Sequence, residues 1–99
     1  MKSKSIIVAL CLSLFFFTNA QAGGDAAAGQ AKSSGCASCH GVDGKKGVPL
    51  AGKEEAYLAE QLRAYKTGSR KNAMMNMMAA KLGDDDINDL AAYYAAKPK

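Results

Sequence analysis

The sequence contains no tryptophan and little other bulky apolar material outside its first residues. All three phenylalanines, Phe15, Phe16 and Phe17, lie in one apolar run near the N-terminus, so tyrosine is the only aromatic residue type in the rest of the chain. The other apolar residues there are mostly alanine. A small domain is already marginally stable, and here it lacks large side chains. We therefore expect a disulfide or a bound group to complete its core.

Cysteine and histidine are equally scarce, with three Cys and one His in the chain. Cys11 belongs to the N-terminal apolar run, which leaves only Cys36 and Cys39. A disulfide across two intervening residues would close a very small loop and would constrain the unfolded chain little. A four-ligand zinc site would need carboxylates in addition to these residues. A bound cofactor is therefore favoured over a disulfide framework.

The first 22 residues have the pattern of a signal peptide. Lys2 and Lys4 precede the apolar run from Ile6 to Phe17, and Ala20-Gln21-Ala22 has the small-x-small pattern of a cleavage site. The run is too short to span a membrane comfortably, which disfavours the alternative of a retained anchor. We predict cleavage after Ala22, export to the periplasm, no permanent membrane anchor and a single domain over residues 23–99.

The charge balance argues against a nucleic-acid partner. The whole chain carries a net charge of +4. Removing Lys2 and Lys4 takes its 13 basic residues to 11, against 9 acidic residues, which leaves +2. Such a small excess of positive charge does not support binding of nucleic acid through bulk electrostatics.

The stretch GCASCHG contains the attachment pattern for a c-type haem, Cys36-x-x-Cys39-His40. Each thiol can add to one haem vinyl group, and the adjacent histidine can then bind the iron from the same side. A redox-active dithiol is the main alternative, but no βαβ pattern surrounds the two cysteines. The sequence predicts one covalently attached haem c, with its iron bound by His40.

The remaining patterns predict helices and loops, and no segment is typical of a strand. Helical spacing and capping residues indicate helices over 25–34, 54–66 and 84–97, with Gly35 and Gly68 ending the first two. A glycine-rich loop is expected over 41–52. Gly83 or Asp84 is the expected N-cap of the last helix. Three acidic residues, Asp84–Asp86, lie in its first turn, where negative charge interacts favourably with the positive end of the helix dipole. Residues 74–81 suggest a loop that leads into a short helical turn.

Four methionines, Met74, Met75, Met77 and Met78, are gathered in one short segment. Methionine often fills irregular cores, but its thioether is also a haem iron ligand. Because His40 is the only histidine, the second axial ligand would have to be methionine, lysine, water or none. A His–Met pair raises the reduction potential and is used in electron-transfer cytochromes.

The order of these features resembles class I cytochromes c, most of all the small bacterial members and one half of the bacterial di-haem cytochromes. The matching stretches are GDAAAGQAK, CASCHGVDG, LAG, AYLAEQLRAYKTGSR, MM, AAKL and DDDINDLAAYYAAK. The resemblance covers nearly all of residues 23–99. It implies a small all-α fold in which three main helices and their loops wrap around one covalently attached haem.

The resemblance also implies roles for individual residues. In these relatives the ligand methionine lies seven residues before the leucine that precedes the last helix, which selects Met75 here, with Met74 as the second choice. Met77 and Met78 are then expected to pack on the haem. The family's close helix crossing implies that Gly29 lies near Tyr93 or Tyr94.

A further implication concerns the partner of the histidine ring. The family's proline offers its carbonyl to that ring, and Pro49 is the only candidate. Relatives have one residue between this proline and Leu-Ala-Gly, whereas Pro49 directly precedes Leu50. That departure leaves the acceptor for His40 open.

These features favour a periplasmic one-electron carrier that is not an enzyme and that shuttles electrons between redox partner proteins, with a terminal oxidase or reductase among the candidates. Several basic residues lie in the segments expected near the haem, namely Lys45, Lys46, Lys53, Lys66, Arg70 and Lys71. They would suit docking of an acidic partner protein, or they simply form a solvated surface. Two alternatives stay open. One is a haem subunit of a larger oxidoreductase, and the other is a haem enzyme or gas binder with an open sixth site.

Overall fold

The computed structural model describes residues 23–99, and the predicted signal peptide and its cleavage site after Ala22 lie outside them. Five helices follow one another: α2 (Ala26–Lys32), α3 (Ser34–His40), α4 (Glu55–Thr67), α5 (Ala73–Ala80) and α6 (Asp84–Ala95). Residues 23–99 contain no strand, so the predicted all-helical fold is confirmed. None of the helices in this range is long and apolar enough to cross a membrane.

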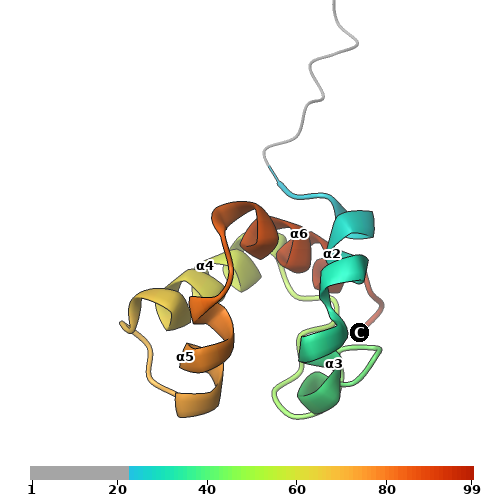
Figure 1. Ribbon diagram of the computed structural model, residues 1–99. Coiled ribbons are helices and arrows are strands. Elements are labelled where there is room, and N and C mark those ends of the chain that lie inside the picture. The colour runs from blue at the N-terminus through green and yellow to red at the C-terminus, as the bar shows by residue number, and fades with distance from the viewer. Residues whose placement is uncertain (1–22) are drawn as a thin grey trace, which may run out of the picture.

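The three helices expected from sequence form a platform, in which α6 packs against both α2 and α4 (Figure 1). Its core is small, because Ile87 and Leu90 are the largest fully buried side chains. Leu58 from α4 and Tyr94 from α6 complete the cluster, together with alanines. The sequence thus gives a core that holds three helices together and supplies little bulk beyond them.

A close crossing joins the first helix of the platform to the last. A side-chain carbon at Gly29 would collide with the Asp89 carbonyl oxygen and lie 2.7 Å from the Tyr93 Cβ, so only glycine fits. Lys32 fixes the same crossing, because its ammonium pairs with Asp86 at 2.9 Å and Asp89 at 2.7 Å. The expected contact of Gly29 with the last helix is therefore present, at Tyr93.

Predicted caps hold at both ends of this platform. The Asp25 carboxylate accepts hydrogen bonds from the first turn of α2. Gly83 is the N-cap of α6, and its N–H donates to the Asp86 carboxylate at 2.8 Å. Gly68 ends α4 in the left-handed conformation.

Two segments are more helical than predicted. The expected stop at Gly35 is wrong, because Ser33 ends α2 and the chain re-enters a helix that contains the whole Cys36-to-His40 stretch. The expected loop over 74–81 is also mostly wrong, since Asn72 caps a helix whose Met75 N–H donates to its side chain at 3.0 Å. The start of α5 depends on the polar side chain of Asn72, which hydrophobic periodicity does not report, whereas Ser33 gives α3 no side-chain cap.

Candidate haem-binding site

The two cysteines and the histidine lie on one short helix. Cys36 and Cys39 are one turn apart in α3, and His40 is its last residue. Both thiols are free. Cys36 is partly buried against the core cluster, and this burial raises its pKa, whereas Cys39 is exposed. The spacing places both sulfurs on neighbouring positions of one helical face, as attachment to a single planar group requires.

The loop after α3 holds the histidine ring from one side. The His40 Nδ1 atom lies 3.0 Å from the carbonyl oxygen of Val48, so Nδ1 carries the proton and donates it there. The loop is closed by further backbone bonds, from the Lys46 N–H to the His40 carbonyl and from the Leu50 N–H to that of Gly44. With Nδ1 occupied, Nε2 is the ring nitrogen available to a metal.

The acceptor of this bond corrects an expectation from sequence. Pro49 was the only candidate by residue type, yet the accepting carbonyl belongs to Val48. Val48 lies two residues before Leu50, the position that the proline occupies in the relatives described above. The acceptor position is therefore kept and only the proline has moved by one residue.

The methionine helix is anchored to α4 by one side chain. The Asn76 amide nitrogen donates to the Tyr65 carbonyl at 2.8 Å and to the Arg70 carbonyl at 2.9 Å, while its oxygen accepts the Asn72 N–H at 2.9 Å. These carbonyls lie at and beyond the end of α4, where helix carbonyls lack partners. Asn76 thus fixes α5 beneath the end of α4.

The four methionines of this segment differ in exposure. Met74 and Met77 are 56% and 57% exposed, whereas Met75 and Met78 are half-buried. The Met78 methyl lies 3.1 Å from where a side-chain carbon on Gly35 would stand, so this side chain reaches α3. Met75 and Met78 therefore face the interior side of α5, and Met74, the second choice for a ligand, faces solvent.

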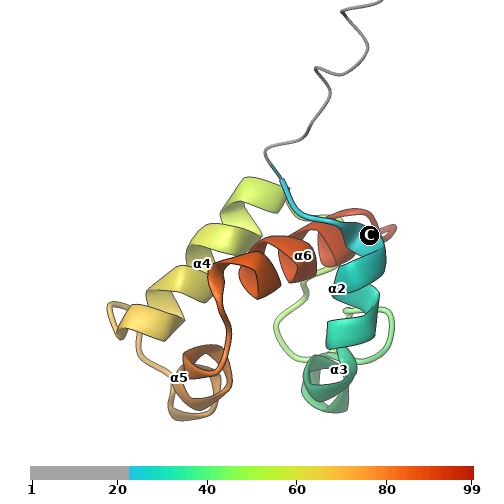
Figure 2. The ribbon, with the colours of Figure 1, turned by 45° about the horizontal axis from the view of Figure 1, so that its top comes forward.

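The arrangement of α3 and α5 fits a large group held between them. Figures 1 and 2 both show these helices on the same side of the platform, one at each end. Among the described helices, the backbone of α3 comes close only to that of α2, and the backbone of α5 only to that of α4. A soft sulfur donor from α5 and an imidazole nitrogen from α3 are both ligands that haem iron accepts. The donor set and its placement therefore fit a c-type haem.

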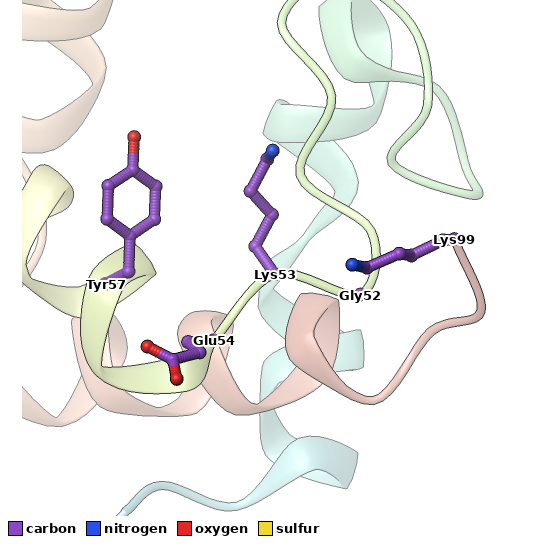
Figure 3. A pocket seen from close by; sticks show the side chains of 5 residues that line it. All are labelled: Gly52, Lys53, Glu54, Tyr57 and Lys99. Atoms are coloured by element: carbon purple, nitrogen blue, oxygen red, sulfur yellow. The ribbon is translucent and has the colours of Figure 1, made fainter.

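Two surface hollows of the protein lie elsewhere. One, of about 370 Å³, is lined by the residues shown in Figure 3, namely Gly52, Lys53, Glu54, Tyr57 and Lys99. The other, of about 430 Å³, lies beside α3 and is lined by Ala37, Gly41, Val42, Asp43, Lys46 and Lys97. Neither includes the cysteines, the histidine or a methionine, so we assign neither to the haem.

Sequence reasoning missed three residues that shape this site. Val48 has an ordinary apolar side chain and acts through its carbonyl. Asn76 stands among methionines, where a buried amide anchor gives no periodic signal. Tyr94 of α6 entered the sequence analysis only as a neighbour of Gly29, and its hydroxyl was not considered. Only the spacing of Val48 from Leu-Ala-Gly offered a signal that the sequence alone contained.

Comparison with known proteins places the chain in a family. The sequence model described as cytochrome c matches residues 26–95. Cytochrome c4 of Pseudomonas aeruginosa is 43% identical over 96 residues, which are 93% of this chain and 48% of that protein. Cytochrome c-554(548) of Halomonas halodenitrificans is 44% identical over 81 residues, which cover 75% of this chain and 98% of that protein.

The fold is also similar to that of a solved cytochrome c4. The crystal structure of reduced cytochrome c4 from Pseudomonas stutzeri matches with a TM-score of 0.71 and 41% identity, over 76% of this chain and 46% of that one. The chain thus spans about half the length of the cytochromes c4 that it matches, and nearly the whole of cytochrome c-554(548). The likeness to one half of a longer cytochrome, expected from the sequence, is confirmed.

Proposed function

We propose that this protein, which belongs to the cytochrome c family and carries a covalently attached haem c, transfers single electrons between partner proteins in the periplasm. The haem supplies the one-electron couple of its iron. The observation that carries the proposal is the convergence of Cys36, Cys39 and His40 on one helix, with a half-buried methionine on a second helix on the same side of the platform. Each part of the chain has a distinct task in this function.

Cys36 and Cys39 attach the group. Each thiol adds across one vinyl, so that a sulfur–carbon bond forms and the thiol hydrogen passes to the other vinyl carbon. No electrons are lost or gained overall. Because both sulfurs belong to one short helix, they fix the plane of the ring against α3. The partly buried position of Cys36 makes it the inner of the two attachment points.

His40 and Met75 would hold the iron of the haem. The Val48 carbonyl orients the imidazole and makes its free nitrogen a better donor. Met75 is half-buried, and the Asn72 cap and the Asn76 anchor fix its backbone. Since the chain provides both ligands, the coordination stays the same in the two oxidation states and little has to rearrange when an electron arrives.

The basic residues suit an acidic redox partner. Lys45, Lys46 and Lys53 are exposed in and just after the loop that holds His40. Positive charge near the edge of the site would steer an acidic protein surface, and added salt would weaken that steering. The chain's own residues offer no spare histidine for acid–base chemistry, so we assign it no catalytic step.

The test is the optical spectrum of the exported protein, oxidised and reduced, extended into the near-infrared. We expect a low-spin spectrum with the weak sulfur-to-ferric charge-transfer band. Met75→Ala should abolish that band and leave the haem attached, whereas the matched Met74→Ala should keep it, because Met74 faces solvent. A high-spin wild-type spectrum without the band would refute the carrier and favour an open site for peroxide or gas.

A further inference from the structure

A hydroxyl without a partner lies in the centre of the protein. Tyr94 in α6 is 4% exposed, and its phenol oxygen is fully covered yet makes no hydrogen bond within residues 23–99. The other polar atoms of buried side chains in this part of the chain are paired. A buried hydroxyl without a partner is unfavourable and is rare in folded proteins. Its presence indicates that an acceptor is missing from the protein chain itself.

The loop that contains Gly44 packs against the Tyr94 ring. Gly44 lies so close to the tyrosine ring that an added side-chain carbon would stand 2.7 Å from Cδ1, and its φ of +73° also favours glycine. The Gly44 carbonyl accepts the N–H groups of Leu50 and Ala51, which holds the loop against the ring. The hydroxyl is thereby covered by protein on this side.

Two side chains of the α2–α3 junction lie near the phenol oxygen. One is Ser33, which is buried and whose hydroxyl donates to the Gln30 carbonyl at 2.9 Å. The other is Cys36. The nearby Tyr94 hydroxyl lowers the pKa of the Cys36 thiol, against the larger effect of burial, which raises it. Burial is also the main cause that raises the pKa of Tyr94, so its phenol keeps its proton.

We propose that the Tyr94 hydroxyl donates a hydrogen bond to the sulfur that links Cys36 to the haem, and that this bond tunes the haem. The inference rests on the proposed function, in which the Cys36 thiol becomes a thioether. A thioether sulfur has lone pairs and no hydrogen, so it acts only as an acceptor. The neutral phenol is a donor, and the two groups already lie beside each other in the core. Attachment of the haem thereby converts the Cys36 sulfur from a thiol, which can also donate, into an acceptor only.

The bond has an electronic consequence. A donor that points at the sulfur withdraws electron density from the carbon that joins it to the porphyrin. Loss of that density favours the ferrous iron, which carries one electron more than the ferric iron. Tyr94 therefore acts as a positioning and tuning residue, and its hydroxyl raises the reduction potential relative to a phenylalanine at the same place.

Tyr94→Phe tests this, because it removes the oxygen and keeps the ring. We expect a lower reduction potential and a shifted carbon–sulfur stretch of the Cys36 linkage in the resonance Raman spectrum. Tyr93→Phe is the matched control, since Tyr93 is the neighbouring tyrosine on the same helix and is only partly buried. It should change neither quantity. The wild-type protein gives a second test, because exchange into heavy water should shift the same stretch.

Several outcomes would overturn the inference. An unchanged potential and stretch in Tyr94→Phe would do so, and so would an equal change in Tyr93→Phe. If Ser33→Ala reproduces the change in potential, the hydroxyl donates to Ser33 instead. If Tyr94→Phe fails to fold, a stretch that is insensitive to heavy water in the wild-type protein refutes the bond. A wild-type protein that loses its haem on denaturation would instead refute the proposed function.

Discussion

Asn76 offers the sharpest test of how the protein would hold its proposed methionine ligand. Its side chain makes three hydrogen bonds, of which two tie α5 to the end of α4 and one braces the start of α5 itself. Asn76→Ala removes all three and leaves two carbonyls and one N–H of the backbone without their partners. Among the described helices, the backbone of the helix that carries Met75 comes close to that of α4 alone, and the Asn76 bonds join it to that helix.

The magnitude follows from these bonds. A typical hydrogen bond inside a protein contributes about 1 kcal/mol net, which gives a ceiling of about 3 kcal/mol. Two of the three bonds are exposed, and water replaces them in part. We therefore expect Asn76→Ala to weaken the docking of α5 by about 2 kcal/mol. At roughly 1.4 kcal/mol per factor of ten, the undocked population rises about 30-fold.

The assay is competition for the iron by added imidazole. Imidazole binds the ferric iron only when the methionine has left, so its apparent affinity reports the undocked population. We expect this affinity to rise about 30-fold in Asn76→Ala, in line with the same population arithmetic. The matched control is Asn88→Ala, since the Asn88 amide oxygen makes one bond to Arg63 between α4 and α6, at 2.8 Å and away from α5. It should leave the imidazole affinity near that of the wild-type protein.

Comparing Asn76→Ala with Asn88→Ala shows whether the Asn76 anchor or general stability controls the imidazole affinity. If both raise the imidazole affinity equally, general destabilisation explains the effect and the anchor is refuted. If neither does, the iron–sulfur bond itself holds α5 in place and Asn76 contributes nothing to it.

Two further predictions follow from the loop and from the platform. Pro49 restricts the backbone of Val48 to an extended conformation, so Pro49→Ala should weaken the hydrogen bond from His40 to the Val48 carbonyl. The imidazole then becomes a poorer donor, and a redox titration should show a higher reduction potential. Pro98→Ala is the control and should leave the potential unchanged. Lys32 holds the pKa of Asp89 below its usual range, so folding stability from this pair is present above about pH 4 and falls as the pH drops further. Lys32→Met should flatten that acid dependence in denaturant titrations at pH 2 to 6, and an unchanged slope would contradict it.

The sequence was most informative where a residue's chemistry acts through its side chain. The pattern Cys36-x-x-Cys39-His40 predicted the haem, and helical periodicity with capping residues predicted α2, α4 and α6. The resemblance to class I cytochromes c implied a close crossing at Gly29, and the crossing is present. In each case the identity of the residue restricts what the structure can be.

Prediction failed where the backbone acts or where a polar side chain reaches across the fold. Val48 accepts from His40 through its carbonyl, which every residue has, so residue type pointed to Pro49 instead. The helix α5 depends on Asn72 as its cap and on Asn76 as its anchor to α4, and neither contact follows from spacing in one segment. Gly35 was expected to end a helix, yet it lies inside α3, where Met78 reaches it from α5.

These contacts show how so small a core could support the two proposed iron ligands, His40 and Met75. The platform of α2, α4 and α6 has an apolar cluster of its own, and Cys36 from the site packs against it. The two ligand-bearing helices join it separately, α3 through Cys36 on the core cluster and α5 through Asn76 on α4. The Met78 side chain of α5 reaches Gly35 of α3, although the backbones of the two helices are not in contact. The protein therefore controls the iron less through its core than through a few polar contacts at the ends of its helices, and substitutions there should change the redox properties before they unfold the platform.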